Sequence, residues 1–197
     1  MQLKAGDVQA QRVLAFWFDG PDGGERGRVR SQWFGKDPVF DQDIRDAFGA
    51  LIERALAGGC EHWALDPDTA PALVIVLDQF TRNVFRDTPK MFAGDAAALA
   101  AARRIVAEGW DLRYDPLLRW FCYLPFEHSE SLDDQRESLR LFGQLRDDPL
   151  AGGAWPWAVR HYEVVERFGR YPHRNTILGR ESTPAEEAFL REPGSRF

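Results

Sequence analysis

The feature that most constrains this chain is a helical spacing of apolar residues that recurs along its length. After Pro38, the residues Phe40, Ile44, Phe48 and Leu51 follow one another at steps of four, four and three. This spacing places them on one face of a helix. No run of the chain keeps the strict alternation that a half-buried strand requires. The sequence therefore predicts an all-α protein of antiparallel helical pairs.

Start and stop signals divide the chain into about eight helices. An acid followed by proline, typical of a helix start, occurs at Asp37–Pro38 and again at Asp115–Pro116. SLDD at 131–134 and TPAE at 183–186 fit capping boxes, and Asp95 is expected to cap the alanine-rich helix that it opens. Pro125 is expected to break or kink its helix. We expect helices over 7–18, 38–57, 69–85, 95–107, 116–124, from 131 to about 145, over 157–168, and a short one from 183.

The length of the chain indicates a single domain, and its net charge argues against two classes of partner. The 197 residues fit a single helical domain over 1–197. The formal net charge of -6 argues against general nucleic-acid binding and against anionic membrane surfaces. Partners of either kind are therefore not expected, whereas a homo-oligomer is left open.

Membrane and secretion signals are absent from the sequence. The longest apolar run, at 72–77, is too short to span a bilayer, and the first residues lack the apolar core of a signal peptide. The two cysteines, Cys60 and Cys122, are expected to be reduced thiols. These observations predict a cytoplasmic protein.

A basic stretch between 167 and 180 stands out in this acidic chain. It contains Arg170, His173, Arg174, Asn175 and Arg180 without one acid. It precedes the helix expected from 183, and a helix start together with arginine suits a carboxylate or phosphate. The alternative is that these side chains satisfy nearby glutamates and attach the C-terminal segment to the helical body.

A second polar group lies on the most apolar of the expected helices. Asp78 and Arg82 are four residues apart, as are Gln79 and Asn83, so each pair can meet on the helix surface. Charges on such a helix are costly unless they are paired. They form either a buried network that fixes helix register or the wall of a polar cavity.

Three further residues are candidates for acid–base chemistry. Glu127 and His128 follow Pro125, where a histidine near carboxylates can move protons at neutral pH. His161 shares a helix stripe with Trp157 and is expected to point inward. For each, a structural role is the alternative: contact with the last carbonyls of a helix for His128, and a hydrogen-bonded core position for His161.

Familiar cofactor and nucleophile motifs do not occur. The chain has no HExxH, no paired CxxC, no phosphate-binding loop and no GxSxG, and its four histidines lack metal-ligand spacing. No cofactor and no metal site are therefore expected.

Several longer motifs resemble one bacterial family of uncharacterised proteins. These motifs are FWF at 16–18, LDQFTRN at 77–83, LPFEHSE at 124–130 and FGRYPHRNTILGRESTPAEEAFL at 168–190. The family usually has proline in place of Thr81 and phenylalanine in place of Tyr171. The resemblance implies an all-α domain related to the tetratricopeptide (TPR) superfamily, a right-handed superhelical array, and it implies no activity. Its polar motif positions here are Asp78, Gln79, Arg82, Asn83, Glu127, His128, Ser129, Glu130, His161, Arg170, His173, Arg174, Asn175 and Arg180.

Three hypotheses account for these residues. The first is a pocket between helices that binds a small anionic molecule, with His128, Glu127 and His161 as the candidate acid–base groups. The second is an interaction module that holds a peptide in a concave groove, as TPR-like folds do. The third is a purely structural polar network. Whether the protein is an enzyme stays open at this point.

Overall fold

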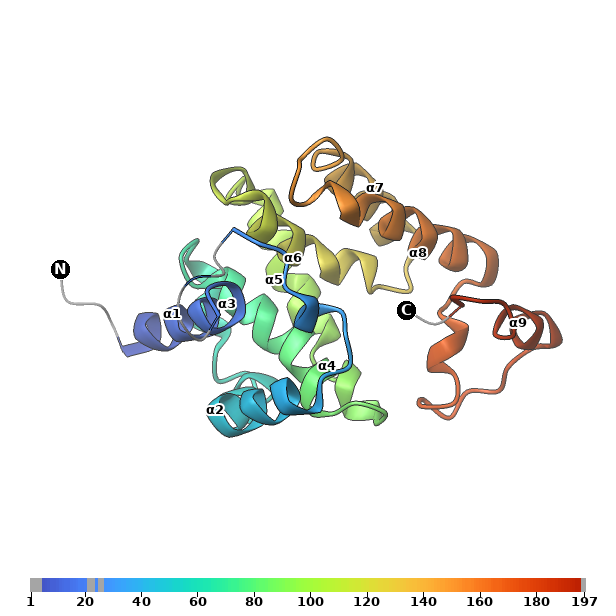
Figure 1. Cartoon of the computed structure of the whole chain (residues 1–197), viewed down its shortest axis with the longest axis horizontal. Helices are drawn as coiled ribbons and strands as arrows, with labels where there is room; N and C mark the ends of the chain where they lie inside the picture. Colours follow the sequence, from blue (N-terminus) through green and yellow to red (C-terminus); the bar gives the residue numbers. More distant parts are fainter. Residues whose placement is uncertain (1–4, 21–23, 25–26, 196–197) are drawn as a thin grey trace.

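The computed structural model describes residues 5–20, 24 and 27–195. Within these ranges the regular structure is entirely helical, as predicted (Figure 1). The α-helices are α1 (Ala5–Phe18), α2 (Pro38–Leu56), α3 (Ala70–Val74), α4 (Thr81–Val84), α5 (Asp95–Ala107), α6 (Pro116–Glu127), α7 (Leu132–Gly143), α8 (Trp155–Phe168) and α9 (Pro184–Phe189). The other helical segments are η1 (Ser31–Trp33), η2 (Glu61–Leu65), η3 (Ile75–Phe80), η4 (Pro89–Phe92), η5 (Asp111–Arg113), η6 (Gly152–Ala154) and η7 (Pro172–Arg174).

The helix expected over 69–85 is the centre of the molecule. It runs from α3 through η3 into α4, and η3 is a π-helical segment in which every residue is buried. This central helix contacts α1, α2, α5 and α6. The later helices then pack in chain order, α5 on α6, α6 on α7 and α7 on α8 (Figure 1).

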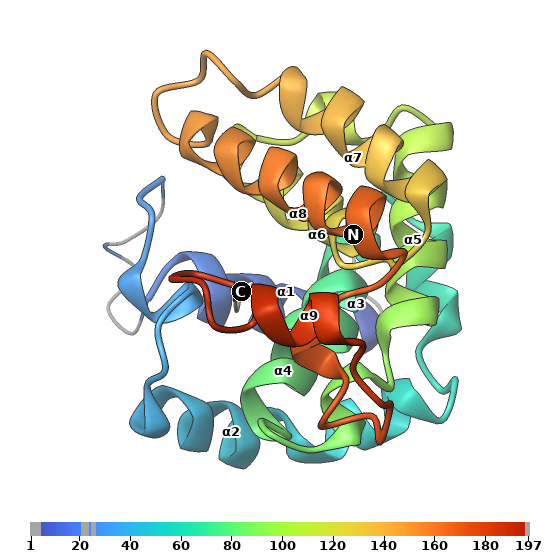
Figure 2. The ribbon, with the colours of Figure 1, turned by 90° about the vertical axis from the view of Figure 1, so that its right-hand side faces the viewer.

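The main core is rich in aromatic side chains. Trp17 lies within 5.7 Å of Phe40, Phe80 and Phe121, measured between ring centroids. Large buried rings remove much apolar area from water, which supplies most of the stabilisation of such a core. A second, smaller cluster joins the end of α8 to the C-terminal segment that follows it. In Figure 1 α9 lies beyond that end of α8, and in Figure 2 it lies below α8.

Several of the expected helix boundaries are correct. The side chain of Asp37 caps α2 and that of Asp115 caps α6, each with proline in the first turn. Thr183 and Glu186 form the predicted capping box of α9. Gly169 ends α8 in the left-handed conformation, at a φ of 68°.

Other boundary predictions are wrong. The helix expected over 116–124 continues through Pro125 to Glu127, so Pro125 does not break it, and a kink there stays a prediction. Ser131 precedes α7 but its side chain makes no capping bond; the hydroxyl of Ser129 accepts from the Ser131 N–H instead. Asp95 is not a cap, because Gly94 holds that position and the Asp95 carboxylate faces two arginines.

A close approach between backbones sets the position of α5. A Cβ atom on Gly94 would lie only 2.1 Å from the carbonyl oxygen of Leu77, inside the π-helical segment. Glycine therefore permits the start of α5 to rest directly on η3. This contact brings Asp95 beside the polar side chains of the central helix.

Candidate functional site

Asp78 lies at the centre of a set of charged side chains that the fold buries together. It comes from the π-helical segment, and such segments are frequent at functional sites. Its Oδ1 atom lies 2.8 Å from Nδ1 of His128 and 3.1 Å from Nη1 of Arg82, while Oδ2 accepts a 2.6 Å hydrogen bond from Gln79. Burial acts to raise the pKa of Asp78, but Arg82 and the His128 contact hold that pKa well below its usual range. Asp78 is therefore ionised at neutral pH.

His128 stands at the C-terminal end of α6 with its ring turned toward Asp78. Because an ionised carboxylate only accepts hydrogen bonds, Nδ1 of His128 carries the ring proton and Nε2 holds the lone pair. Burial and then the charge of Arg82 lower the pKa of His128, although Asp78 opposes this. The ring is thus neutral at pH 7, with a defined tautomer.

Arg82 joins the central helix to α5. Its guanidinium makes two hydrogen bonds to the carboxylate of Asp95, at 2.9 and 3.2 Å, and donates to the backbone oxygen of Asp78 at 2.7 Å. Paired N–H donors of this kind match a carboxylate in both geometry and charge. Arg82 therefore lies between two carboxylates, one buried and one at the edge of the cluster.

Arg174 reaches the same place from η7, in the basic stretch. Its Nη2 atom donates to the backbone oxygen of His128 at 2.9 Å, and Nη1 lies 3.5 Å from Oδ2 of Asp95. The rings of Phe92 and Tyr171 contact its guanidinium, with centroids 4.7 and 4.6 Å from the central carbon. Nε is buried and has no hydrogen-bond partner among the described residues. Burial and the charge of Arg82 lower the pKa of Arg174.

We refer to Asp78, Arg82, Asp95, His128 and Arg174 as the buried charge cluster. Its members come from the central helix, the start of α5, the end of α6 and η7. The side chains become more exposed from Asp78, at 0%, through Arg174 and Arg82, at 8% and 15%, to Asp95, at 25%. Two carboxylates balance two guanidiniums, so the cluster is neutral while His128 is neutral.

Glu127 and His161 form a second pair beside this cluster. Oε1 of Glu127 lies 3.3 Å from Nδ1 of His161, and that nitrogen also donates to the backbone oxygen of Trp157 at 2.8 Å. Burial and the nearby charge of Asp78 raise the pKa of Glu127 to about 8. Burial lowers the pKa of His161 to about 3. At pH 7 both side chains are therefore neutral, so their contact is not an ion pair.

Tyr171 links the C-terminal segment to this second pair. Its hydroxyl donates to the backbone oxygen of Glu127 and accepts a 2.8 Å hydrogen bond from Gln135. The ring lies 5.5 Å from that of His161 and 5.5 Å from that of His173. Burial and Arg174 lower the pKa of His173 to about 3, so this ring is neutral as well. The pair of His128 with Asp78 and the pair of His161 with Glu127 thus lie in one polar region.

The structure brings together many of the residues singled out from the sequence. Asp78, Gln79, Arg82, Glu127, His128, His161, His173 and Arg174 all lie in or beside the buried charge cluster. The predicted pairing of Asp78 with Arg82 is present. The expected pairing of Gln79 with Asn83 is absent, because Gln79 binds Asp78 and Asn83 turns toward α2, where it donates to Asp41 at 2.6 Å.

Three residues of the basic stretch have other partners. Arg170 makes two hydrogen bonds to Glu186, at 2.6 and 2.8 Å. Arg180 binds the carboxylate of Glu130 at 2.7 and 2.9 Å and also donates to Asn175. Asn175 in turn donates to Ser182. These contacts hold the C-terminal segment in place. For these three residues they match the structural role that was the alternative to anion binding for the basic stretch.

Two members of the site have no signal in the sequence that marks them. Asp95 precedes an alanine-rich run and has the pattern of an ordinary helix start. Phe92 lies in a short turn, where nothing indicates contact with Arg174. Trp157, expected to face inward with His161, is instead 50% exposed.

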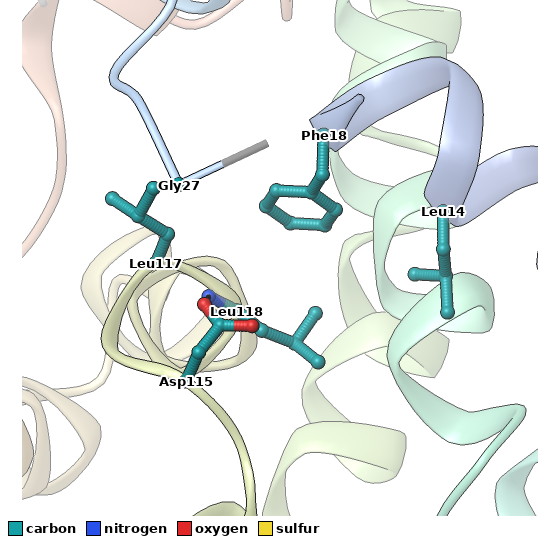
Figure 3. A pocket seen from close by; sticks show the side chains of 6 residues that line it. All are labelled: Leu14, Phe18, Gly27, Asp115, Leu117 and Leu118. Atoms are coloured by element: carbon teal, nitrogen blue, oxygen red, sulfur yellow. Dashed lines mark hydrogen bonds between the residues drawn. The ribbon is translucent and has the colours of Figure 1, made fainter. Parts of the chain in front are cut away.

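A small pocket lies on another part of the molecule. It is lined by Leu14, Phe18, Gly27, Asp115, Leu117 and Leu118 and encloses about 30 Å³ (Figure 3). Four of these residues are apolar, and none belongs to the buried charge cluster. In the described ranges, no group of His, Cys, Asp and Glu has the arrangement of a metal site. None of the helices described is long and apolar enough to span a bilayer.

Comparison with known proteins assigns the chain to a family. Residues 13–194 match DUF924, described as bacterial proteins of unknown function. The chain belongs to this family. A solved structure with the same fold is that of a protein of unknown function, ATU0120, from Agrobacterium tumefaciens. The two share 36% identity and a TM-score of 0.82, over 93% of this chain and 97% of that one. No protein with a curated description matches this DUF924 chain.

Proposed function

We propose that the buried charge cluster binds a small anionic molecule and that His128 exchanges a proton with it. The observation that carries the proposal is the state of Arg174. This guanidinium is almost wholly buried, its contact with Asp95 is long, and its Nε finds no hydrogen-bond partner within the described part of the chain. Burying a cation without full compensation is costly, so an anion at this place would supply the missing interaction.

The proton step follows from the tautomer of His128. Asp78 fixes the proton on Nδ1, which leaves Nε2 as the acceptor. A proton leaves the bound molecule for Nε2, and the imidazolium that results is stabilised by ionised Asp78. The proton returns from Nε2 when the reaction is complete. Glu127, neutral at pH 7, is the nearby carboxylic acid and can donate a proton of its own.

The proposal also covers the arrangement of the helices and the location of the protein in the cell. We infer a right-handed superhelical array of the TPR-like type in the cytoplasm, with the anion site between its helices. A peptide in a concave groove is the second candidate, in which Arg174 would bind a C-terminal carboxylate. It is favoured by the way that α5, α6, α7 and α8 pack in chain order.

A third candidate is a structural network without a ligand. It is favoured by a specific observation: Arg82, Arg170, Arg174 and Arg180 each face a carboxylate of the chain itself. On this account no anion raises the stability of the protein, and loss of Arg174 only weakens the fold.

Thermal unfolding against a panel of carboxylates and phosphorylated metabolites separates these accounts. A ligand at about 100 times its Kd adds roughly 2.7 kcal/mol, which corresponds to a rise in Tm of roughly 5–10 °C. We expect the rise in wild type and in Arg170→Lys, a matched control outside the cluster, and expect Arg174→Lys to lose it. A panel without effect in wild type would contradict the proposal. Peptides with a free and with an amidated C-terminus are tested beside this panel, and a rise in Tm confined to the free C-terminus would favour the second candidate.

A further inference from the structure

The carboxylate of Asp95 lies where a ligand of the proposed site would bind. Arg82 and Arg174 are distant in sequence, yet both guanidiniums face this one group. Oδ2 of Asp95 is shared, at 3.2 Å from Arg82 and 3.5 Å from Arg174. We call these three side chains the arginine clamp.

Asp95 is the member of the clamp that can leave with least disturbance. Its side chain is the most exposed of the three, at 25%, and lies at the start of a helix. Arg82 would keep an ionic partner, because Asp78 contacts it at 3.1 Å from the inner side. Arg174 would keep its hydrogen bond to the backbone of His128 and its contacts with Phe92 and Tyr171.

The charges around the clamp favour one class of ligand. Exchange of Asp95 for another carboxylate leaves the number of charges between the guanidiniums unchanged. A phosphate dianion would add a further negative charge close to Asp78, which is ionised and buried. The planar donor groups of two arginines also fit a planar carboxylate.

We propose that the arginine clamp is an exchangeable carboxylate site, in which the carboxylate of a small organic acid replaces that of Asp95. This inference rests on the proposed function and narrows its ligand to a carboxylic acid. The remainder of the ligand extends toward His128, whose backbone oxygen already contacts Arg174. Asp95 acts as an internal competitor that keeps the two guanidiniums paired until the ligand arrives.

The test is the binding of acetate and of inorganic phosphate, measured by calorimetry at constant ionic strength. If Asp95 occupies the clamp in nine of ten molecules, its removal makes the apparent Kd for acetate about tenfold smaller. We therefore expect Asp95→Asn to bind acetate about tenfold more tightly than wild type does. Glu186→Gln, which removes a carboxylate held by Arg170 elsewhere, is the matched control and should leave the Kd unchanged.

Each outcome bears on a different claim. Equal acetate affinity in wild type and Asp95→Asn would overturn the exchange. Binding of phosphate but not acetate, lost in Arg174→Lys, would also overturn it while leaving the proposed anion site intact. Absence of any binding that depends on Arg174 would contradict both proposals.

A second measurement covers the case in which Asp95→Asn does not fold. In wild-type protein labelled with ¹³C at aspartate carboxyls, saturating acetate should move the Asp95 signal toward that of a solvated aspartate. A signal that stays in place at saturation would overturn the exchange as well.

Discussion

Replacing Glu127 with Gln should stabilise the protein by an amount that increases with pH. The pKa of Glu127 is about 8 in the folded protein, against an ordinary value of 4.5, because burial and the charge of Asp78 disfavour its ionised form. Between these two values the folded protein holds a proton that the unfolded chain has released. The free energy of unfolding of wild type therefore falls as pH rises through this window. The stability that wild type gains by keeping Glu127 protonated is fully present below pH 4.5 and is lost by about pH 8.

The expected size follows from the difference between the two pKa values. Each unit corresponds to about 1.4 kcal/mol, so the advantage of Glu127→Gln over wild type should widen by about that amount per pH unit and reach about 5 kcal/mol. Any loss of packing or hydrogen bonding in the variant adds an offset that does not depend on pH. The slope, rather than the value at one pH, therefore reports the titration of this residue.

Urea unfolding followed by tryptophan fluorescence, at pH values from about 5 to 8, measures this slope. Glu130→Gln is the matched control. Although burial opposes it, Arg180 lowers the pKa of Glu130, so wild type should exceed this variant in stability at neutral pH and lose that advantage as pH falls. A difference between Glu127→Gln and wild type that does not change with pH would refute the reasoning.

Three further predictions concern the start of α5, the central helix and α6. Gly94→Ala places a methyl group against the backbone of Leu77 and should cost about 1–3 kcal/mol in thermal unfolding, whereas Gly49→Ala, with open space around it, should be neutral or stabilising. Asp78→Asn removes the central buried charge and should cost about 3–5 kcal/mol in urea unfolding; a cost below about 1 kcal/mol would contradict its role. Burial raises the pKa of the Cys122 thiol, so a thiol reagent should modify it only after unfolding, and rapid labelling of the native protein would contradict this.

The sequence was sufficient to predict the helices because their signals are local. Apolar spacing and capping residues act within a few positions, so α2 and α9 could be placed correctly with their caps. The errors arose where contacts distant in sequence decide the outcome. Asp95 looks like a cap in its own segment, but Gly94 rests on Leu77 and turns Asp95 toward the arginines. The π-helical segment likewise has no periodic signal that distinguishes it from an α-helix.

The candidate site was predictable in kind but not in detail. Charges on an apolar helix identified Asp78 and Arg82, because burial of such groups demands partners, and the basic stretch identified Arg174. The other partners of these residues depend on tertiary contacts, which pair Arg82 with Asp95 and Arg174 with the backbone of His128. No spacing rule within one segment can reveal such pairs.

The central claim is that an anion binds at Arg174 beside His128. The most direct measurement is an NMR titration that follows the Nε–Hε signal of Arg174, assigned by its loss in Arg174→Lys, as acetate or phosphate is added. The account predicts a saturable shift of this signal together with a shift of the His128 ring, while the Nε–Hε signal of Arg170 stays in place. Shifts of equal size at Arg170 and Arg174, or none at either, would contradict it.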